Sequence, residues 1–202
     1  MKKILHLTLI AAVLSGAMVS CKKGENDPFL SLRSRKARVA GEWTVTAFES
    51  KSMTVDNGSN STLTTTATYN GSAETSVETI SVGGASTTET TVSSYTMSLD
   101  IDKDGTYELT QSGTDGTYTE KGTWLFVGKS KENELKNKEA IMLVTESESS
   151  TGYNTTYTGL DGRIFVIDQL KNKEMSLTLE SSSNGSDGST SSFSNKLTFE
   201  QK

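Results

Sequence analysis

The chain has 202 residues, of which 29 are Ser and 30 are Thr, while apolar residues make up only 33%. Globular domains commonly contain about 45–50% apolar residues, a figure that also counts Gly. The net charge of −5 and the single Pro nevertheless do not fit a disordered chain, which combines low hydrophobicity with high net charge. Because β-branched Thr favours half-exposed strands, the composition predicts one β-rich domain.

The first 20 residues have the pattern of a cleaved signal peptide. Lys2 and Lys3 precede a mostly apolar run, Ile4–Leu14, which is too short to span about 30 Å of hydrocarbon. Small residues follow, and Met18-Val19-Ser20-Cys21 resembles the lipobox of bacterial lipoproteins. This resemblance implies that Cys21 is lipidated with a diacyl or triacyl anchor. The alternative is an ordinary secretory signal that contains a Cys.

Charge is distributed unevenly along the remainder of the chain. Residues 21–27 are expected to form a lipidated tether, and residues 22–38 carry six basic and two acidic groups, which suit either anionic headgroups or a solvated helix face. Residues 39–202 hold 12 basic and 23 acidic groups, an acidic balance that argues against nucleic-acid binding. In the bacterial lipoproteins that the lipobox pattern resembles, Asp directly after the Cys favours retention in the inner membrane. Because Lys22 follows Cys21 here, the resemblance implies an outer-membrane location, with the membrane face left open.

A domain is expected over residues 28–202, and it begins with a short helix. Asp27 is a suitable N-cap and Pro28 a suitable first helical residue. Apolar and basic residues then follow at helical spacing as far as Val39, and Ala40-Gly41 ends the pattern. The sequence therefore predicts a helix of about ten residues.

After residue 41 the apolar residues alternate with a period of two, as in strands that bury one face. The alternating segments contain Trp43 to Ala47, Tyr95 to Ile101, Tyr107 to Leu109, Trp124 to Phe126, Ile141 to Leu143, Ile164 to Val166, Met175 to Leu179, and Leu197 to Phe199. Turn signals separate them, at Asp56-Asn57-Gly58, Asn70-Gly71, Gly83-Gly84, Asp104-Gly105, Asp115-Gly116, Asp161-Gly162 and Asn184-Gly185. This order predicts an antiparallel up-and-down meander of about eight to ten strands.

Two segments differ from the alternating pattern. Residues 54–94 are rich in Ser and Thr and poor in large apolar residues, so we expect strands that pair but bury little, and that project beyond the core or line a polar face. Residues 129–139 are expected to form a solvated, charged loop. Closing the meander into a barrel would remove its unpaired edges.

Two Gly-x-Trp motifs, Gly41-Glu42-Trp43 and Gly122-Thr123-Trp124, flank the segment 102–107. With the short helix before the first motif, this arrangement resembles the lipocalin superfamily, and in particular the lipocalin-like lipoproteins of Bacteroidota. The resemblance covers roughly residues 27–200. It implies a lipocalin-like barrel in which the first Trp plugs the closed end beneath the helix. The alternative for Trp43 is a core anchor in a β-sandwich.

The aromatic residues Trp43, Tyr95, Tyr107 and Trp124 are the candidate lining of a ligand cavity. The leading hypothesis is therefore a membrane-anchored module that binds a small apolar or amphipathic ligand. Small barrels can also fill their interiors with side chains. The competing hypothesis is an interaction or structural protein that uses the Ser/Thr-rich strands 54–94 to contact a protein or glycan.

Little in the sequence indicates catalysis, a cofactor or a metal. The only histidine, His6, lies in the predicted signal peptide, which argues against His-dependent nucleophilic catalysis and His-ligated zinc in the mature chain. Asp100, Asp102 and Asp104 match the first half of an EF-hand loop, but the twelfth position is Gln111 rather than Glu. We therefore favour a β-hairpin over a calcium site, and expect no enzyme activity and no cofactor.

Overall fold

The computed structural model describes residues 33–114, 116–132, 135, 139–150 and 153–202. The predicted signal peptide, Cys21 and the tether 21–27 lie outside these residues. The described part forms a short helix, α2 (Arg35–Val39), and ten strands. They are β1 (Gly41–Asp56), β2 (Ser61–Tyr69), β3 (Ala73–Val82), β4 (Ala85–Ile101), β5 (Thr106–Gly113), β6 (Gly116–Phe126), β7 (Ala140–Ser150), β8 (Tyr153–Leu170), β9 (Glu174–Asn184) and β10 (Thr190–Gln201).

The helix is shorter than the predicted one. Ser34 is its N-cap, with extended backbone and a side chain that accepts a hydrogen bond from the Ala37 N–H at 3.1 Å. A continuous helix from Pro28 to Val39 is therefore wrong, because the extended Ser34 separates the two ends of that range. The expected start at Asp27 lies outside the described residues.

The strands confirm the predicted all-β, up-and-down barrel. Each strand pairs antiparallel with its neighbours in the sequence, and β10 pairs with β1 to close a ring of ten. At one end of the ring β1 also pairs with β4, from Gly41 opposite Ile101 to Thr44 opposite Ser98. Because β2 and β3 do not take part in that contact, eight strands close the barrel at this end.

Large side chains fill the eight-stranded end. Trp43, Phe199 and Leu170 are completely buried, and the surrounding apolar residues of all eight strands are at most 8% exposed. Burying each such side chain stabilises the fold by about 1.5–3 kcal/mol. The Trp43 Nε1–H donates a hydrogen bond to the Val39 carbonyl oxygen at 2.8 Å, which ties the end of α2 to the core. The period-two pattern of the sequence is the direct cause of this core.

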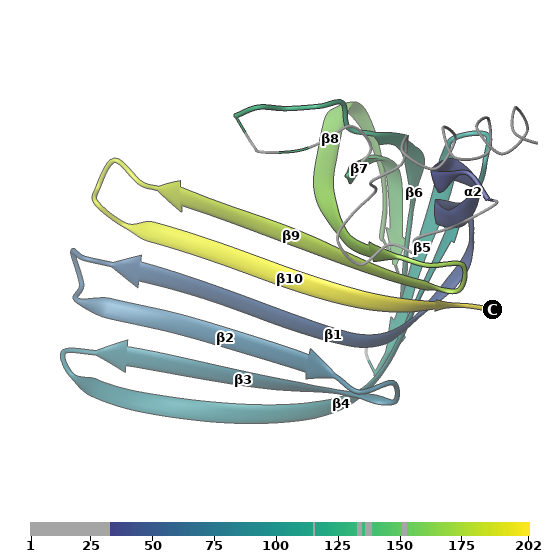
Figure 1. Cartoon of the computed structure of the whole chain (residues 1–202). Coiled ribbons are helices and arrows are strands. Elements are labelled where there is room, and N and C mark those ends of the chain that lie inside the picture. The colour runs from purple at the N-terminus through teal and green to yellow at the C-terminus, as the bar shows by residue number, and fades with distance from the viewer. Residues whose placement is uncertain (1–32, 115, 133–134, 136–138, 151–152) are drawn as a thin grey trace, which may run out of the picture.

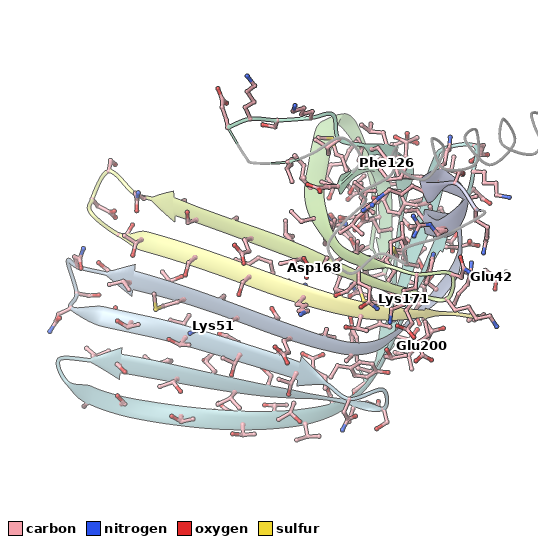
Figure 2. The ribbon with its side chains drawn as sticks, viewed as in Figure 1. Glu42, Lys51, Phe126, Asp168, Lys171 and Glu200 are labelled. Carbon is pink, nitrogen blue, oxygen red and sulfur yellow. The ribbon has the colours of Figure 1, made fainter. Side chains whose placement is uncertain are left out.

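Two strands, β2 and β3, and the halves of four others that lie beyond the ring leave the barrel as a single-layered sheet. They belong, in spatial order, to β9, β10, β1, β2, β3 and β4, and Figure 1 shows them running away from the barrel formed with β5 to β8. Most side chains on this sheet are short and at least partly exposed, unlike the dense cluster inside the barrel (Figure 2). This confirms the prediction that strands 54–94 pair, bury little and project beyond the core.

Turn signals located most of the hairpins, with one clear exception. The Gly83-Gly84 turn joins β3 to β4 with both glycines at positive φ, as the sequence predicts. Asp161-Gly162, predicted as a turn, instead lies inside β8, where Gly162 pairs with Val144. The prediction is wrong because β7 and β8 change register here: Thr145 opposes Asp161, whereas Ser147 opposes Thr156. The Asp-Gly pair marks this irregularity within a strand.

The segment predicted as a charged loop, 129–139, joins β6 to β7. Of its described charged residues, Lys129, Lys131 and Glu132 are exposed, in agreement with the expectation, whereas Glu139, next to β7, is partly buried. An isolated bridge between Ser130 and Leu135 gives the loop local order.

Candidate ligand pocket at the barrel mouth

The four aromatic residues predicted to line a cavity occupy different places. Trp43, Tyr107 and Trp124 are 0%, 3% and 5% exposed and belong to the packed core. The Trp124 Nε1–H donates to the Asp102 carbonyl oxygen at 2.8 Å, and Lys36 Nζ lies 5.8 Å from the centre of the Trp124 ring. Of the four, only Tyr95 lines the pocket at the barrel mouth.

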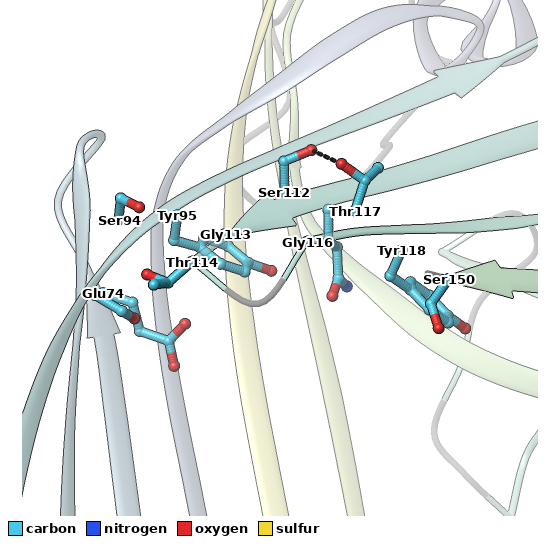
Figure 3. Close-up of a pocket in the computed structure, with 12 residues that line it drawn as sticks. Glu74, Ser94, Tyr95, Ser112, Gly113, Thr114, Gly116, Thr117, Tyr118 and Ser150 are labelled. Carbon is cyan, nitrogen blue, oxygen red and sulfur yellow. Dashed lines mark hydrogen bonds between the residues drawn. The ribbon is translucent and has the colours of Figure 1, made fainter. Parts of the chain in front are cut away.

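That pocket has a volume of about 410 Å³ and lies where the projecting sheet leaves the barrel. Figure 3 shows Tyr95 and Glu74 on one side, Tyr118 and Ser150 on the other, and Gly113 between them. Gly113 pairs with Gly116 across β5 and β6. Since neither glycine has a side chain, space is left between the two tyrosines.

An aromatic cluster supports the Tyr95 side of the pocket. Tyr95 contacts Phe48 and Tyr69 edge-to-face, each with ring centres 5.5 Å apart, while Phe48 and Tyr69 stack at 5.6 Å. Burial, followed by the nearby charge of Glu74 and by Tyr69, raises the pKa of Tyr95 to about 12. The Tyr95 hydroxyl is therefore neutral at physiological pH and available for hydrogen bonding.

A buried carboxylate, Glu120, organises the polar side of the barrel mouth. Glu120 is 1% exposed, and its Oε1 accepts hydrogen bonds from the Tyr107 hydroxyl, from Arg163 Nη2 and, at 3.1 Å, from Thr145 Oγ1. Its Oε2 accepts a further bond from the Tyr118 hydroxyl at 3.3 Å. A buried charge with an ion-pair partner and several donors is well satisfied. This network holds Tyr118 at the pocket edge.

The sequence contains a signal for Glu120 that the prediction did not use. Trp124, Gly122 and Glu120 are two residues apart on β6, so a strand that buries Trp124 also directs Glu120 inward. Arg163 faces the same interior from β8, where Leu143 pairs with it. Its partnership with Glu120 spans the intervening strand β7 and joins residues 43 positions apart in the sequence.

The mouth has an excess of negative charge. Glu148 pairs with Glu120 across β6 and β7 and accepts a hydrogen bond from the Tyr157 hydroxyl at 2.8 Å. Burial, followed by a hydrogen bond to Glu148 and the charges of both glutamates, raises the pKa of Tyr118 well above its ordinary value. The Glu74 carboxylate on the opposite wall has no ion-pair partner among the described residues.

The three aspartates considered for calcium lie at a hairpin, as favoured from the sequence. Asp102 to Gly105 form the turn between β4 and β5, and Asp104 accepts hydrogen bonds from the Thr106 N–H at 3.0 Å and its hydroxyl at 2.8 Å. Burial and the neighbouring charge of Asp102 raise the pKa of Asp100, which lies on the outer face. Within the described ranges, no group of three or more Asp, Glu, His or Cys residues could hold a metal ion.

Comparisons with known proteins give no family assignment. No family model, curated protein or solved structure matches the chain significantly. Over the part of the chain that the structure describes, no helix has the length and apolar character required to cross a membrane.

Proposed function

We propose that this protein is a lipid-anchored binding module that takes up a small amphipathic ligand at the barrel mouth and performs no catalysis. The observation that carries the proposal is the pocket of about 410 Å³ between Tyr95 and Tyr118, with the Glu74 carboxylate on its wall. The pocket lies at the mouth, at the opposite end of the barrel from the filled end around Trp43. A ligand is therefore expected at the mouth, beside the aromatic cluster, rather than in the core.

The lining specifies the chemistry of the ligand. Tyrosine rings offer apolar faces, whereas the hydroxyls of Ser93, Thr117 and Ser150 offer hydrogen bonds. Glu74, without an ion-pair partner among the described residues, attracts a cation or a hydrogen-bond donor. A molecule with an apolar body and an amine head fits this combination, and an anionic head does not.

A fluorescence titration tests the proposal. Dansylcadaverine, which joins an apolar ring to an ammonium group, is added to the full chain and to the variants Tyr95→Ala and Glu74→Gln. We expect saturable binding by the wild type and a loss of about tenfold in affinity for each variant, which corresponds to one charged or aromatic contact of about 1.4 kcal/mol.

Glu78→Gln is the matched control, because Glu78 lies on β3, four residues from Glu74, faces the same side of the sheet and is exposed outside the pocket. Equal affinities for the wild type and the Tyr95→Ala and Glu74→Gln variants would contradict binding at this pocket. So would a Glu78→Gln effect as large as that of Glu74→Gln.

The anchor is proposed from the sequence, on the lipobox pattern that ends at Cys21. An acylated Cys21 with two or more chains would give stable attachment to the outer membrane. We expect the native protein to require detergent for extraction and Cys21→Ser to release it. Wild-type protein in the soluble periplasmic fraction would contradict the anchor while leaving the pocket proposal untouched.

A second candidate function is favoured by the projecting sheet, whose two faces are both accessible to solvent. In this proposal strands 54–94 contact a protein or glycan at the cell surface. Because β1 and β4 pair directly at the closed end, removing residues 58–90 should leave the eight-stranded ring intact. A glycan array probed with the full chain and with this deletion tests the candidate: binding that the deletion abolishes supports it, and binding that survives contradicts it.

A further inference from the structure

The projecting part of β4 forms an open edge of the sheet. β4 pairs with β5 only from Tyr95 to Ile101, whereas the preceding ten residues, Ala85–Ser94, pair with β3 on one side alone. Figure 1 shows this half of β4 at the margin of the projecting sheet. Within the described residues, half of its backbone N–H and C=O groups therefore point away from the sheet with no strand beside them.

This edge lacks the devices that usually prevent strand pairing. Residues 85–94 contain no Pro, Lys or Arg, their register with β3 has no bulge, and Glu89 is their only charge. Val92 is 66% exposed. The other margin of the projecting sheet is the end of β9 that no longer pairs with β8. It is only six residues long, Leu179–Asn184, and contains Glu180.

We propose that the β4 edge is an interaction surface for a second copy of this chain. Two β4 edges pair antiparallel across a two-fold axis, and the two six-stranded projections become one continuous twelve-stranded sheet. A second copy fits because it offers an edge of the same length and the same low charge, whereas the β9 edge is shorter. The inference does not depend on the pocket at the barrel mouth.

Glu89 and Thr90 are the two central residues of the open edge, and charge decides which of them lies at the two-fold axis. A two-fold axis at Glu89 would place two carboxylates directly opposite each other, which is unfavourable. An axis at Thr90 instead places Glu89 opposite Thr91 of the second copy, on one face of the sheet. On the other face the same register covers Val92 with Thr88 of the second copy. About one hydrogen bond forms for each paired residue.

This register also separates the bulky parts of the two molecules. The intermolecular pairing ends with Ser86 at the hairpin tip of one copy opposite Ser94 of the other, because the next residue of β4, Tyr95, already pairs with Gly113 of β5. Each barrel is thus placed beyond the tip of its neighbour's projection.

Disulfide cross-linking tests both the pairing and its register. In the full chain carrying Cys21→Ser, which removes the native thiol and the lipid, Thr90→Cys places two thiols opposite each other at the axis. We expect a disulfide-linked dimer under mild oxidation. Thr64→Cys is the matched control, because Thr64 faces the same side of the sheet on β2, between two paired strands, and should remain uncrosslinked.

Sedimentation measures the association without any cross-link. We expect the Cys21→Ser chain to dimerise and Thr88→Lys/Thr90→Lys, which adds four charges at the joint, to weaken association by at least about tenfold. Thr62→Lys/Thr64→Lys makes the same charge change on β2 and should dimerise normally, with circular dichroism confirming that each variant folds. A monomeric Cys21→Ser chain, or a dimer unaffected by the β4 lysines, overturns the proposal, and a foreign strand would then be the better occupant of the edge.

Discussion

Gly122, the glycine of the second Gly-x-Trp motif, lies where the structure has no room for a side chain, and adding one methyl group tests this. Gly122 is buried in β6, beside the register shift between β6 and β7. A β-carbon at this position would lie 1.9 Å from the Val144 carbonyl oxygen and 2.9 Å from its carbonyl carbon. It would also lie 3.0 Å from the Tyr107 ring. Most of these atoms are backbone, so they cannot move aside by a change of rotamer.

The expected destabilisation follows from these contacts. Replacing Gly with Ala at an unstrained site raises stability by about 0.4–1 kcal/mol, through the entropy of the unfolded chain. Here β6 and β7 must instead separate locally, and overpacking of this kind commonly costs about 1–3 kcal/mol, occasionally more. Moving Tyr107 would also weaken its hydrogen bond to Glu120, and bonds to charged groups contribute about 1.5–3 kcal/mol. We expect Gly122→Ala to lower the free energy of unfolding by about 3 kcal/mol.

Urea denaturation followed by tryptophan fluorescence measures this change, because Trp43 and Trp124 are both buried. Gly128→Ala is the control: Gly128 is exposed in the loop after β6, with no atom within 4 Å of an added β-carbon. Its effect should stay within about 0.5 kcal/mol. If Gly122→Ala proves as stable as Gly128→Ala, the close approach of β6 and β7 described above is refuted.

Three further predictions concern the core and the mouth. Trp43→Phe removes the hydrogen bond to Val39 and leaves a void, so thermal denaturation should show a loss of about 2–4 kcal/mol, and an unchanged melting temperature would contradict the packing. Glu120→Gln leaves the Arg163 guanidinium without its carboxylate and should cost about 1–3 kcal/mol in urea, whereas a stabilised variant would count against the network. Because the folded-state pKa of Tyr95 is raised to about 12, its contribution to stability is complete below about pH 10 and is lost as the pH rises through 12. Tyr95→Phe should therefore make stability fall less steeply over this range, and an identical slope would contradict the shift.

The sequence predicted those features of the fold that depend on residues close together in the chain. Alternating apolar residues such as Leu99 and Ile101 identified strands with one buried face, and dipeptides such as Gly83-Gly84 identified hairpins. The polar strands could be separated from the core because they contain few large apolar residues. Asp161-Gly162 shows the limit of such signals, since the same dipeptide occurs at a change of register inside β8.

The site was less predictable because it depends on contacts across the barrel. The alternating pattern places the aromatic residues on the inward face but does not say how far along the barrel each one lies. In the structure Trp43 lies in the filled end, whereas Tyr95 lies at the mouth. That depth is set by the pairing of β1 with β4, which no local pattern indicates. The partnership of Glu120 with Arg163 likewise appears only when β6, β7 and β8 curve around the interior.

The binding of an amphipathic ligand at the barrel mouth is tested most directly by mapping where the ligand lies. Backbone amide and tryptophan indole NMR shifts of the ¹⁵N-labelled chain are recorded during a titration with dansylcadaverine. The largest shifts are expected for Glu74, for Ser93 to Tyr95, for Gln111 to Thr114 and for Gly116 to Tyr118, with little change at the Trp43 and Trp124 indoles. Shifts concentrated at those two indoles, or along the parts of the projecting sheet outside the pocket, residues 61–68 and 78–92, would contradict binding at the mouth.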